Sequence, residues 1–175
     1  RSHLLYPVGL ALLLTIGCVK ANVESVVDKS STWKIDNLLI VADGPSKDLS
    51  KKFAKILSSK FTDFKIANEY KVISLSKPRQ LSLEANADPE PIVDVIAKSE
   101  KQFILISNMT RVVTANGIAS SIEMEMVVYS KAANKIIWKS QVTTGSGWSS
   151  IGSETILLND IVEKTVLKIH ADELF

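Results

Sequence analysis

The strongest constraint on the fold lies in residues 103–142, where apolar side chains recur at every second position and turn-forming residues interrupt them. The apolar run 103–106, continuing to Val113, precedes Asn116–Gly117, a dipeptide that favours a tight hairpin turn. A second turn is predicted at 132–135. The alternating apolar-face positions on either side of it are Ile122, Met124, Met126 and Val128, then Ile136, Trp138, Ser140 and Val142. A period of two is that of a half-buried strand, so the pattern predicts a three-stranded meander.

Two strand–helix units are predicted before the meander. The apolar run 38–42 indicates a buried strand, and Ser46 is a suitable N-cap for the helix that follows. The next strand is expected within 64–73, and Asp88–Pro89 is typical of a helix start. The apolar positions expected in the first helix are Leu49, Phe53, Ile56, Leu57 and Phe61.

A closing helix is predicted after the meander, capped by Ser153. Its expected apolar side is Ile156, Leu157, Ile161, Val162, Thr165, Val166 and Ile169. The sequence therefore predicts an α/β (α+β) fold with a mixed five-stranded sheet, in the order β-α-β-α-β-β-β-α, and helices packed on the sheet. The single cysteine excludes an intrachain disulfide, so one domain, residues 33–175, must be held together by its apolar core.

The first eighteen residues differ in character from this domain. Arg1 precedes an apolar stretch of thirteen residues, Leu4 to Ile16, that ends beside Gly17 and Cys18. A membrane-spanning helix needs about 20 residues. A basic start, a short apolar core and a small residue are the parts of a secretory signal. A transmembrane anchor stays an alternative.

The segment Leu14-Thr15-Ile16-Gly17-Cys18 resembles the lipobox of bacterial lipoproteins, with Thr15 where that family usually has Leu, Val or Ile. The resemblance implies a signal peptide at 1–17, cleavage before Cys18 and acylation of Cys18. The stretch that follows is polar and rich in small residues, so we expect a lipidated tether at 18–32, with one short strand at 23–27 as an alternative. Val19, which is not aspartate, implies sorting to the outer membrane, on the periplasmic side, in a Gram-negative bacterium. The competing reading is that Cys18 is an inert, buried cysteine.

The predicted order of elements over Lys34 to Phe175 is similar to that of small domains in envelope lipoproteins, such as the activators of penicillin-binding proteins and the amino-terminal domain of TolB. This resemblance implies a domain that meets another envelope protein. It carries over no partner-binding residue.

Charge and residue types limit the chemistry. The chain has 21 basic and 19 acidic side chains, and this balance gives no reason to expect nucleic acid as a partner. Only His3 and His170 are present, so neither a zinc site of histidines and cysteines nor any other metal or cofactor is expected. Glu123 and Glu125 share a strand face, where a solvated role is favoured over acid–base catalysis.

Trp148 lies between Gly147 and Ser149 in a predicted loop, and these three residues are the candidate partner-binding site. The competing role for Trp148 is a lid over the core. We expect a non-enzymatic outer-membrane lipoprotein that presents a periplasmic interaction domain, with no catalytic residue. The alternatives are a lipid- or glycan-binding domain and an envelope hydrolase that uses a loop serine or the pair Glu123 and Glu125.

Overall fold

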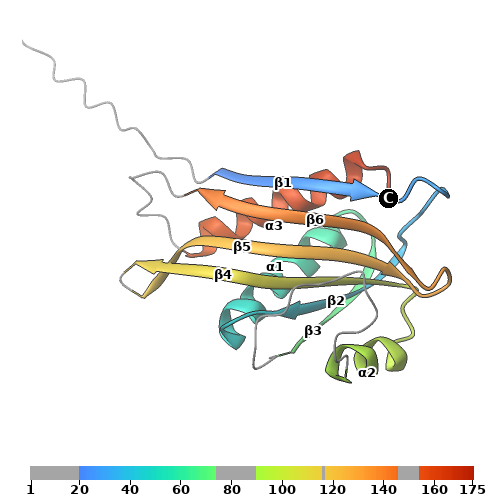
Figure 1. Cartoon of the computed structure of the whole chain (residues 1–175), viewed down its shortest axis with the longest axis horizontal. Helices are drawn as coiled ribbons and strands as arrows, with labels where there is room; N and C mark the ends of the chain where they lie inside the picture. The colour runs from blue at the N-terminus through green and yellow to red at the C-terminus, as the bar shows by residue number, and fades with distance from the viewer. Residues whose placement is uncertain (1–19, 74–89, 116, 146–153) are drawn as a thin grey trace, which may run out of the picture.

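The computed structural model describes residues 20–73, 90–115, 117–145 and 154–175, which form a single sheet with three helices (Figure 1). The elements, in chain order, are β1 (Lys20–Val27), β2 (Asn37–Asp43), α1 (Lys47–Asp63), β3 (Ala67–Val72), α2 (Glu90–Lys98), β4 (Phe103–Ala115), β5 (Ile118–Ser130), β6 (Lys135–Gly145) and α3 (Glu154–Ala171).

The sheet is mixed, as predicted, but it has six strands in the spatial order β1-β6-β5-β4-β2-β3. The pairs β1–β6, β6–β5 and β5–β4 are antiparallel, and β2 pairs in parallel with both β4 and β3. The predicted number of five strands is therefore wrong, and so is the predicted order of elements, because one more strand precedes the first predicted one. The additional strand is β1, which lies within the range predicted as a tether.

The reason for this error is the composition of β1. Ala21 is buried and Val23 half-buried, but the positions between them are polar, and Ser25 takes an inward position. An edge strand needs only this weak alternation, because it has one neighbour and one covered face. Pairing with β6 along its whole length supplies the backbone hydrogen bonds that its side chains do not predict.

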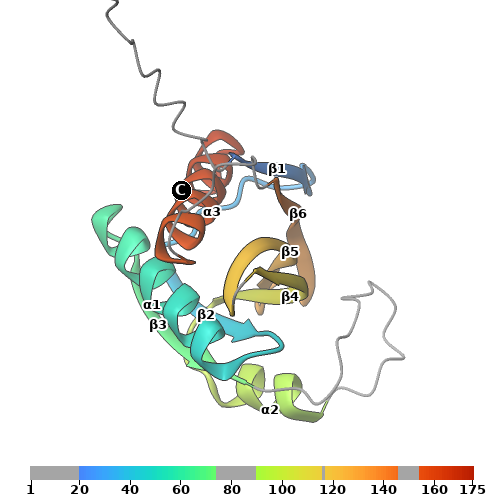
Figure 2. The ribbon, with the colours of Figure 1, turned by 90° about the vertical axis from the view of Figure 1, so that its left-hand side faces the viewer.

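Helices α1 and α3 cover one face of the sheet, which we call the inner face (Figure 2). Ser46 caps α1 as predicted, since its hydroxyl accepts a hydrogen bond from the Leu49 amide at 3.4 Å. The inner face and the two helices enclose the main core, whose largest members include Phe53, Phe61, Leu57, Ile122, Met124 and Trp138. Ile156, predicted on the apolar side of α3, is instead 55% exposed, because the buried stripe begins at Leu157.

The opposite, outer face of the sheet is covered only in part. Val95 and Ile96 of α2 pack on a smaller cluster around Leu39 and Ile104. The outward residues of β6 and β1 include Thr143, Gln141, Asn22 and Glu24, all exposed. The outer face therefore divides into an apolar part beneath α2 and a polar, open part on β1, β6 and the neighbouring half of β5.

Irregularities in register decide which side chains face inward. Thr110 is an additional residue in β4 and Ser120 in β5, since the pairs Met109–Met124 and Arg111–Glu123 are followed by Val113–Ser121 and Thr114–Ala119. A third irregularity puts Ile137 beside Trp138 in the core. Ile136 was predicted on the face of Trp138, but it packs on the outer cluster for this reason.

Trp138, 1% exposed, should be essential to the core. We expect Trp138→Ala to lower the free energy of unfolding by about 3–5 kcal/mol, the usual cost of removing a large aromatic side chain from a core. Urea denaturation followed by circular dichroism measures this change. The control is Val26→Ala on β1, where the side chain is 74% exposed and the change should stay within about 0.5 kcal/mol. Equal effects of the two substitutions would contradict this account of the core.

Candidate functional site

The residues singled out as sites by the sequence lie outside the described part of the chain. Cys18 precedes Lys20, the first described residue, and Gly147, Trp148 and Ser149 fall between β6 and α3. Their roles in lipidation and partner binding stay predictions. The same holds for the Ser153 cap and for the helix start at Asp88–Pro89.

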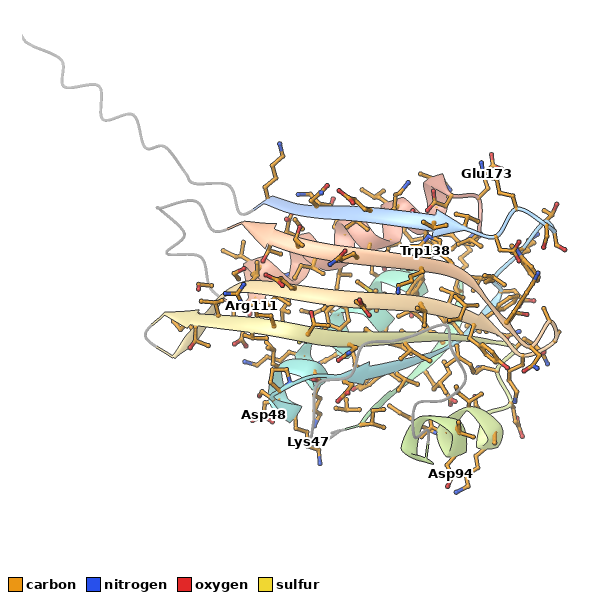
Figure 3. All side chains as sticks on the ribbon, in the orientation of Figure 1. Lys47, Asp48, Asp94, Arg111, Trp138 and Glu173 are labelled. Atoms are coloured by element: carbon orange, nitrogen blue, oxygen red, sulfur yellow. The ribbon has the colours of Figure 1, made fainter. Side chains whose placement is uncertain are left out.

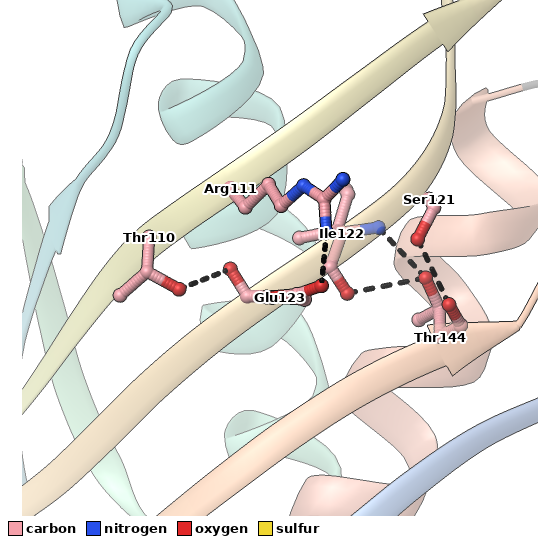
Figure 4. Close-up of polar contacts among 6 residues, drawn as sticks. All are labelled: Thr110, Arg111, Ser121, Ile122, Glu123 and Thr144. Atoms are coloured by element: carbon pink, nitrogen blue, oxygen red, sulfur yellow. Dashed lines mark hydrogen bonds and ion pairs between the residues drawn. The ribbon is translucent and has the colours of Figure 1, made fainter.

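Glu123 and Glu125 both lie on the outer face of β5, as their spacing predicts. Arg111 of β4 lies opposite Glu123, and Figure 4 shows the ion pair between them. The Nη1 atom of Arg111 is 3.1 Å from Glu123 Oε1. Glu125 also has a partner. A carboxylate held in an exposed ion pair on a flat sheet face is suited to a cross-strand contact, which contributes about 0.2–1 kcal/mol. Within the described ranges, no group of three or more His, Cys, Asp or Glu side chains could hold a metal ion.

His170 lies in the last turn of α3, where it is exposed. Its ring centroid is 5.8 Å from that of Phe64 and 5.6 Å from that of Phe175. Phe175 also makes an edge contact with Phe61 at 5.9 Å. These contacts assign His170 a packing role at the end of α3, where it joins the C-terminus to α1.

Two lysines of α1 line a groove that also carries acidic side chains. Lys55 and Lys60 flank an open groove of about 650 Å³ between α1 and α3, and Asp63 and Glu163 lie along the same groove. Lys52 pairs with Glu154 at 2.7 Å, across the same two helices. Because both signs of charge line the groove, it does not present the single-signed surface that attracts an anionic ligand at long range.

The most distinctive polar arrangement in the described residues fastens β1 to α3. Asp160 Oδ2 accepts a hydrogen bond from the Ala21 amide at 2.6 Å and is 3.0 Å from Lys164 Nζ. One turn before the C-terminus, Asp172 Oδ2 accepts from Ser25 Oγ at 2.5 Å and from Trp138 Nε1 at 2.8 Å. We call Asp160 and Asp172, with the groups that donate to them, the strand latch.

Electrostatics favour the ionised form of Asp172. Burial alone raises its pKa, but the hydrogen bonds from Ser25, Trp138 and Lys168 outweigh burial and hold the pKa below the usual aspartate value. Lys168 Nζ lies 3.0 Å from Asp172 Oδ1. The latch is therefore a charged acceptor that joins an edge strand, a core tryptophan and the end of a helix.

A second polar cluster follows β1 directly. Lys135 Nζ is 2.5 Å from Asp28 Oδ2 and lies 5.2 Å from the centre of the Trp33 ring. The hydrogen bond from Lys135 lowers the pKa of Asp28 to about 2. Trp33 Nε1 donates to the Asp28 carbonyl at 2.8 Å, so the turn after β1 is closed by its own side chains.

Both ends of β1 are thus fixed, and this was not predicted from the sequence. The available signals were local: Asp160 and Lys164, and likewise Lys168 and Asp172, are spaced four apart on the closing helix. Such a spacing indicates a helical pair but does not say that a strand 139 residues earlier shares the carboxylate.

The start of β1, the β4–β5 turn and the first turn of α3 lie at one end of the molecule, which we call the hairpin end (Figure 1). Figure 3 places Arg111, Lys47 and Asp48 toward this end. Three exposed apolar side chains also belong to it: Val113 (41% exposed), Ile118 (49%) and Ile156 (55%). No helix in the described part of the chain is long and apolar enough to cross a membrane.

Two solved structures share this fold. A PelC dodecamer from Paraburkholderia phytofirmans is similar with a TM-score of 0.54 and 11% identity, covering 83% of this chain and 94% of that chain. A second crystal form, of a single-substitution variant of that protein, gives 0.53 and 11%, with 83% and 96% covered. At this identity the likeness concerns the fold alone. No family model matches the sequence, and no curated protein does.

The strand latch gives a pH-dependent prediction. We expect Asp172→Ala to lower the free energy of unfolding at pH 7 by about 1.5–3 kcal/mol, the range for hydrogen bonds to a charged group. Because the folded-state pKa is depressed, the contribution of the charge is complete above the unfolded value near 3.9 and is lost as the pH falls through the folded value.

Urea denaturation between pH 7 and pH 3 measures this difference, which should shrink below about pH 4 as the wild-type carboxylate becomes protonated. Asp94→Ala is the control, since Asp94 is 72% exposed and pairs with Lys98 only at 3.5 Å. A difference between wild type and Asp172→Ala that does not change with pH would show that Asp172 acts only through packing.

Proposed function

We propose that this chain is a non-enzymatic lipoprotein of the outer membrane, which is anchored through Cys18 and holds an interaction domain on the periplasmic side. The observation that carries the proposal is the position of β1. Cys18 stands only two residues before Lys20, where the sheet begins. Two residues span at most about 7 Å, so an acylated Cys18 would hold the sheet itself close to the lipid surface.

The strand latch supports the same proposal mechanically. Terminal strands fray unless they are tied down. β1 is tied along its length by β6 and on its inner side by Asp160 and Asp172. A pull on the anchor would therefore act on a strand that is joined to the sheet and to α3 at once.

The partner is proposed to be another envelope protein, and further copies of this chain are the first candidate. The support is the PelC structure, which is described as a dodecamer and has the same fold. The strand β3, whose Tyr70 is 37% exposed, lies at one edge of the sheet. At the other edge, the Ala21 amide of β1 already donates to Asp160, so β3 is the candidate edge within the described residues. Unpaired edges are surfaces on which strands of another chain can add.

Lipidation is tested by Cys18→Ser. Wild-type protein should partition into detergent and carry the mass of its acyl chains, whereas the variant should stay unprocessed or soluble, because two or more acyl chains are needed for stable attachment. Intact-mass spectrometry of protein extracted from membranes gives the measurement. An unmodified Cys18 on a mature chain would end the lipoprotein proposal.

Assembly is tested by the native mass of the extracted protein. We expect a complex of several copies in mild detergent, with a defined stoichiometry. Dissociation to monomers at micromolar concentration would contradict self-assembly and direct the search to a different envelope protein.

A further inference from the structure

We propose that the tip of the β4–β5 hairpin rests in the headgroup layer of the membrane that holds the anchor, so that the hairpin end of the domain faces the lipid. This inference rests on the proposed lipidation of Cys18 and adds the orientation of the domain. The lipid-facing residues are Val113 and Ile118, supported by Ile156.

The register of the sheet places the hairpin tip and the anchor at similar heights. Lys20 pairs with Gly145, and Ser121 reaches the Thr144 carbonyl with a hydrogen bond of 2.9 Å (Figure 4). Ile118 lies three residues beyond Ser121 along β5. Because Ser120 is the additional residue of β5, Ile118 lies only two paired steps beyond Ser121, as Ala115 does beyond Val113 on β4. At about 3.3 Å per residue the tip therefore extends about 7 Å past the start of β1. Cys18 lies within about 7 Å of Lys20, so both reach toward the same plane.

The side chains at the tip point away from the core. Ala119 is buried on the inner face, which directs Ile118 to the outer face. Val112 packs against the main core, which directs Val113 outward as well. Ile118 pairs with Ala115, two residues after Val113, so the two exposed side chains are diagonal neighbours. They form a small exposed apolar patch at the hairpin end of the outer face.

Charged side chains of both signs stand behind these apolar groups. Lys20 at the start of β1, Lys47 at the start of α1 and Asp48 beside it are exposed at the hairpin end. Arg111, two residues from Val113, pairs with Glu123. Long basic side chains can lie along an interface with their charge at the level of the headgroups. Apolar tips with charged groups of both signs set back from them match the change in polarity from acyl chains to zwitterionic headgroups.

Two or three exposed side chains are too few to bind a bilayer by themselves. The proposed anchor makes the bilayer the surface that these side chains contact. Once the chain is anchored two residues from β1, contact of the tip with lipid is intramolecular and needs little intrinsic affinity. The far half of the same face offers a contrast. Val26 is 74% exposed, but it lies six residues along β1 from Lys20, about 20 Å from the hairpin end.

The test uses the full acylated protein, extracted and placed in vesicles of phosphatidylethanolamine and phosphatidylglycerol. Ile118→Cys and Val26→Cys are each labelled with an NBD fluorophore, while acylation blocks Cys18. We expect brominated lipids to quench the label at position 118 at least twofold and to leave the label at position 26 unchanged, although Val26 is the more exposed residue in the free domain.

Equal quenching at the two positions, or none at either, would overturn the orientation while leaving the anchor intact. A blue-shifted emission at position 118 without quenching would place the tip against protein, which also overturns it. Intact mass is measured on the same samples, and an unmodified Cys18 would overturn the anchor and the orientation together. A second comparison tests the apolar contact with lipid. The label is placed at Val113→Cys, with and without the additional substitution Ile118→Asp. The aspartate should reduce quenching of the label and leave the thermal melt unchanged.

Discussion

Burial of the inner sheet face beneath α1 and α3 is the constraint on which the other features depend. The main core consists of side chains from this face and from the two helices, with Trp138, Met124 and Phe53 fully buried. Since side chains alternate along a strand, every inward residue forces its neighbours outward. Only α2 covers part of the outer face, so the rest of that face must be polar to stay in water. The surface available to a partner or to lipid is thereby fixed.

The edge strand β1 shows how a segment with little apolar surface is kept in the fold. Its inward side chains are Ala21, Ser25 and two valines, Val23 and Val27, that are only partly buried, so burial contributes less here than on the central strands. The strand latch supplies further stabilising contacts for β1, because Asp172 joins Ser25 to Trp138 and Asp160 binds the Ala21 amide. A carboxylate that is already ionised accepts stronger hydrogen bonds than a neutral group. The start of the described chain is therefore held by the sheet and by α3 at once.

The sequence predicted elements whose side chains pack in a regular period and missed those fixed by distant contacts. The meander, the Ser46 cap and the burial of Trp138 follow from spacing and local chemistry, and the structure confirms them. The strand β1 was missed because its stabilising partners lie on α3, and Ile136 was placed on the wrong face because no local signal announces a register irregularity. The proposed sites at Cys18 and Trp148 stay predictions, since both lie outside the described residues.

The orientation of the hairpin tip depends on the irregularity at Thr110. If Thr110 occupied an ordinary paired position instead, strict alternation from buried Met109 would turn Arg111 inward and leave Val112 exposed. Burying an unpaired guanidinium costs far more than exposing one valine. With Thr110 as an additional residue, Arg111 contacts Glu123 on the outer face, Val112 packs in the core and Val113 is exposed. The exposed apolar tip is therefore a consequence of keeping Arg111 in water, and the additional residue in β5 at Ser120 keeps Ile118 on the same side as Val113.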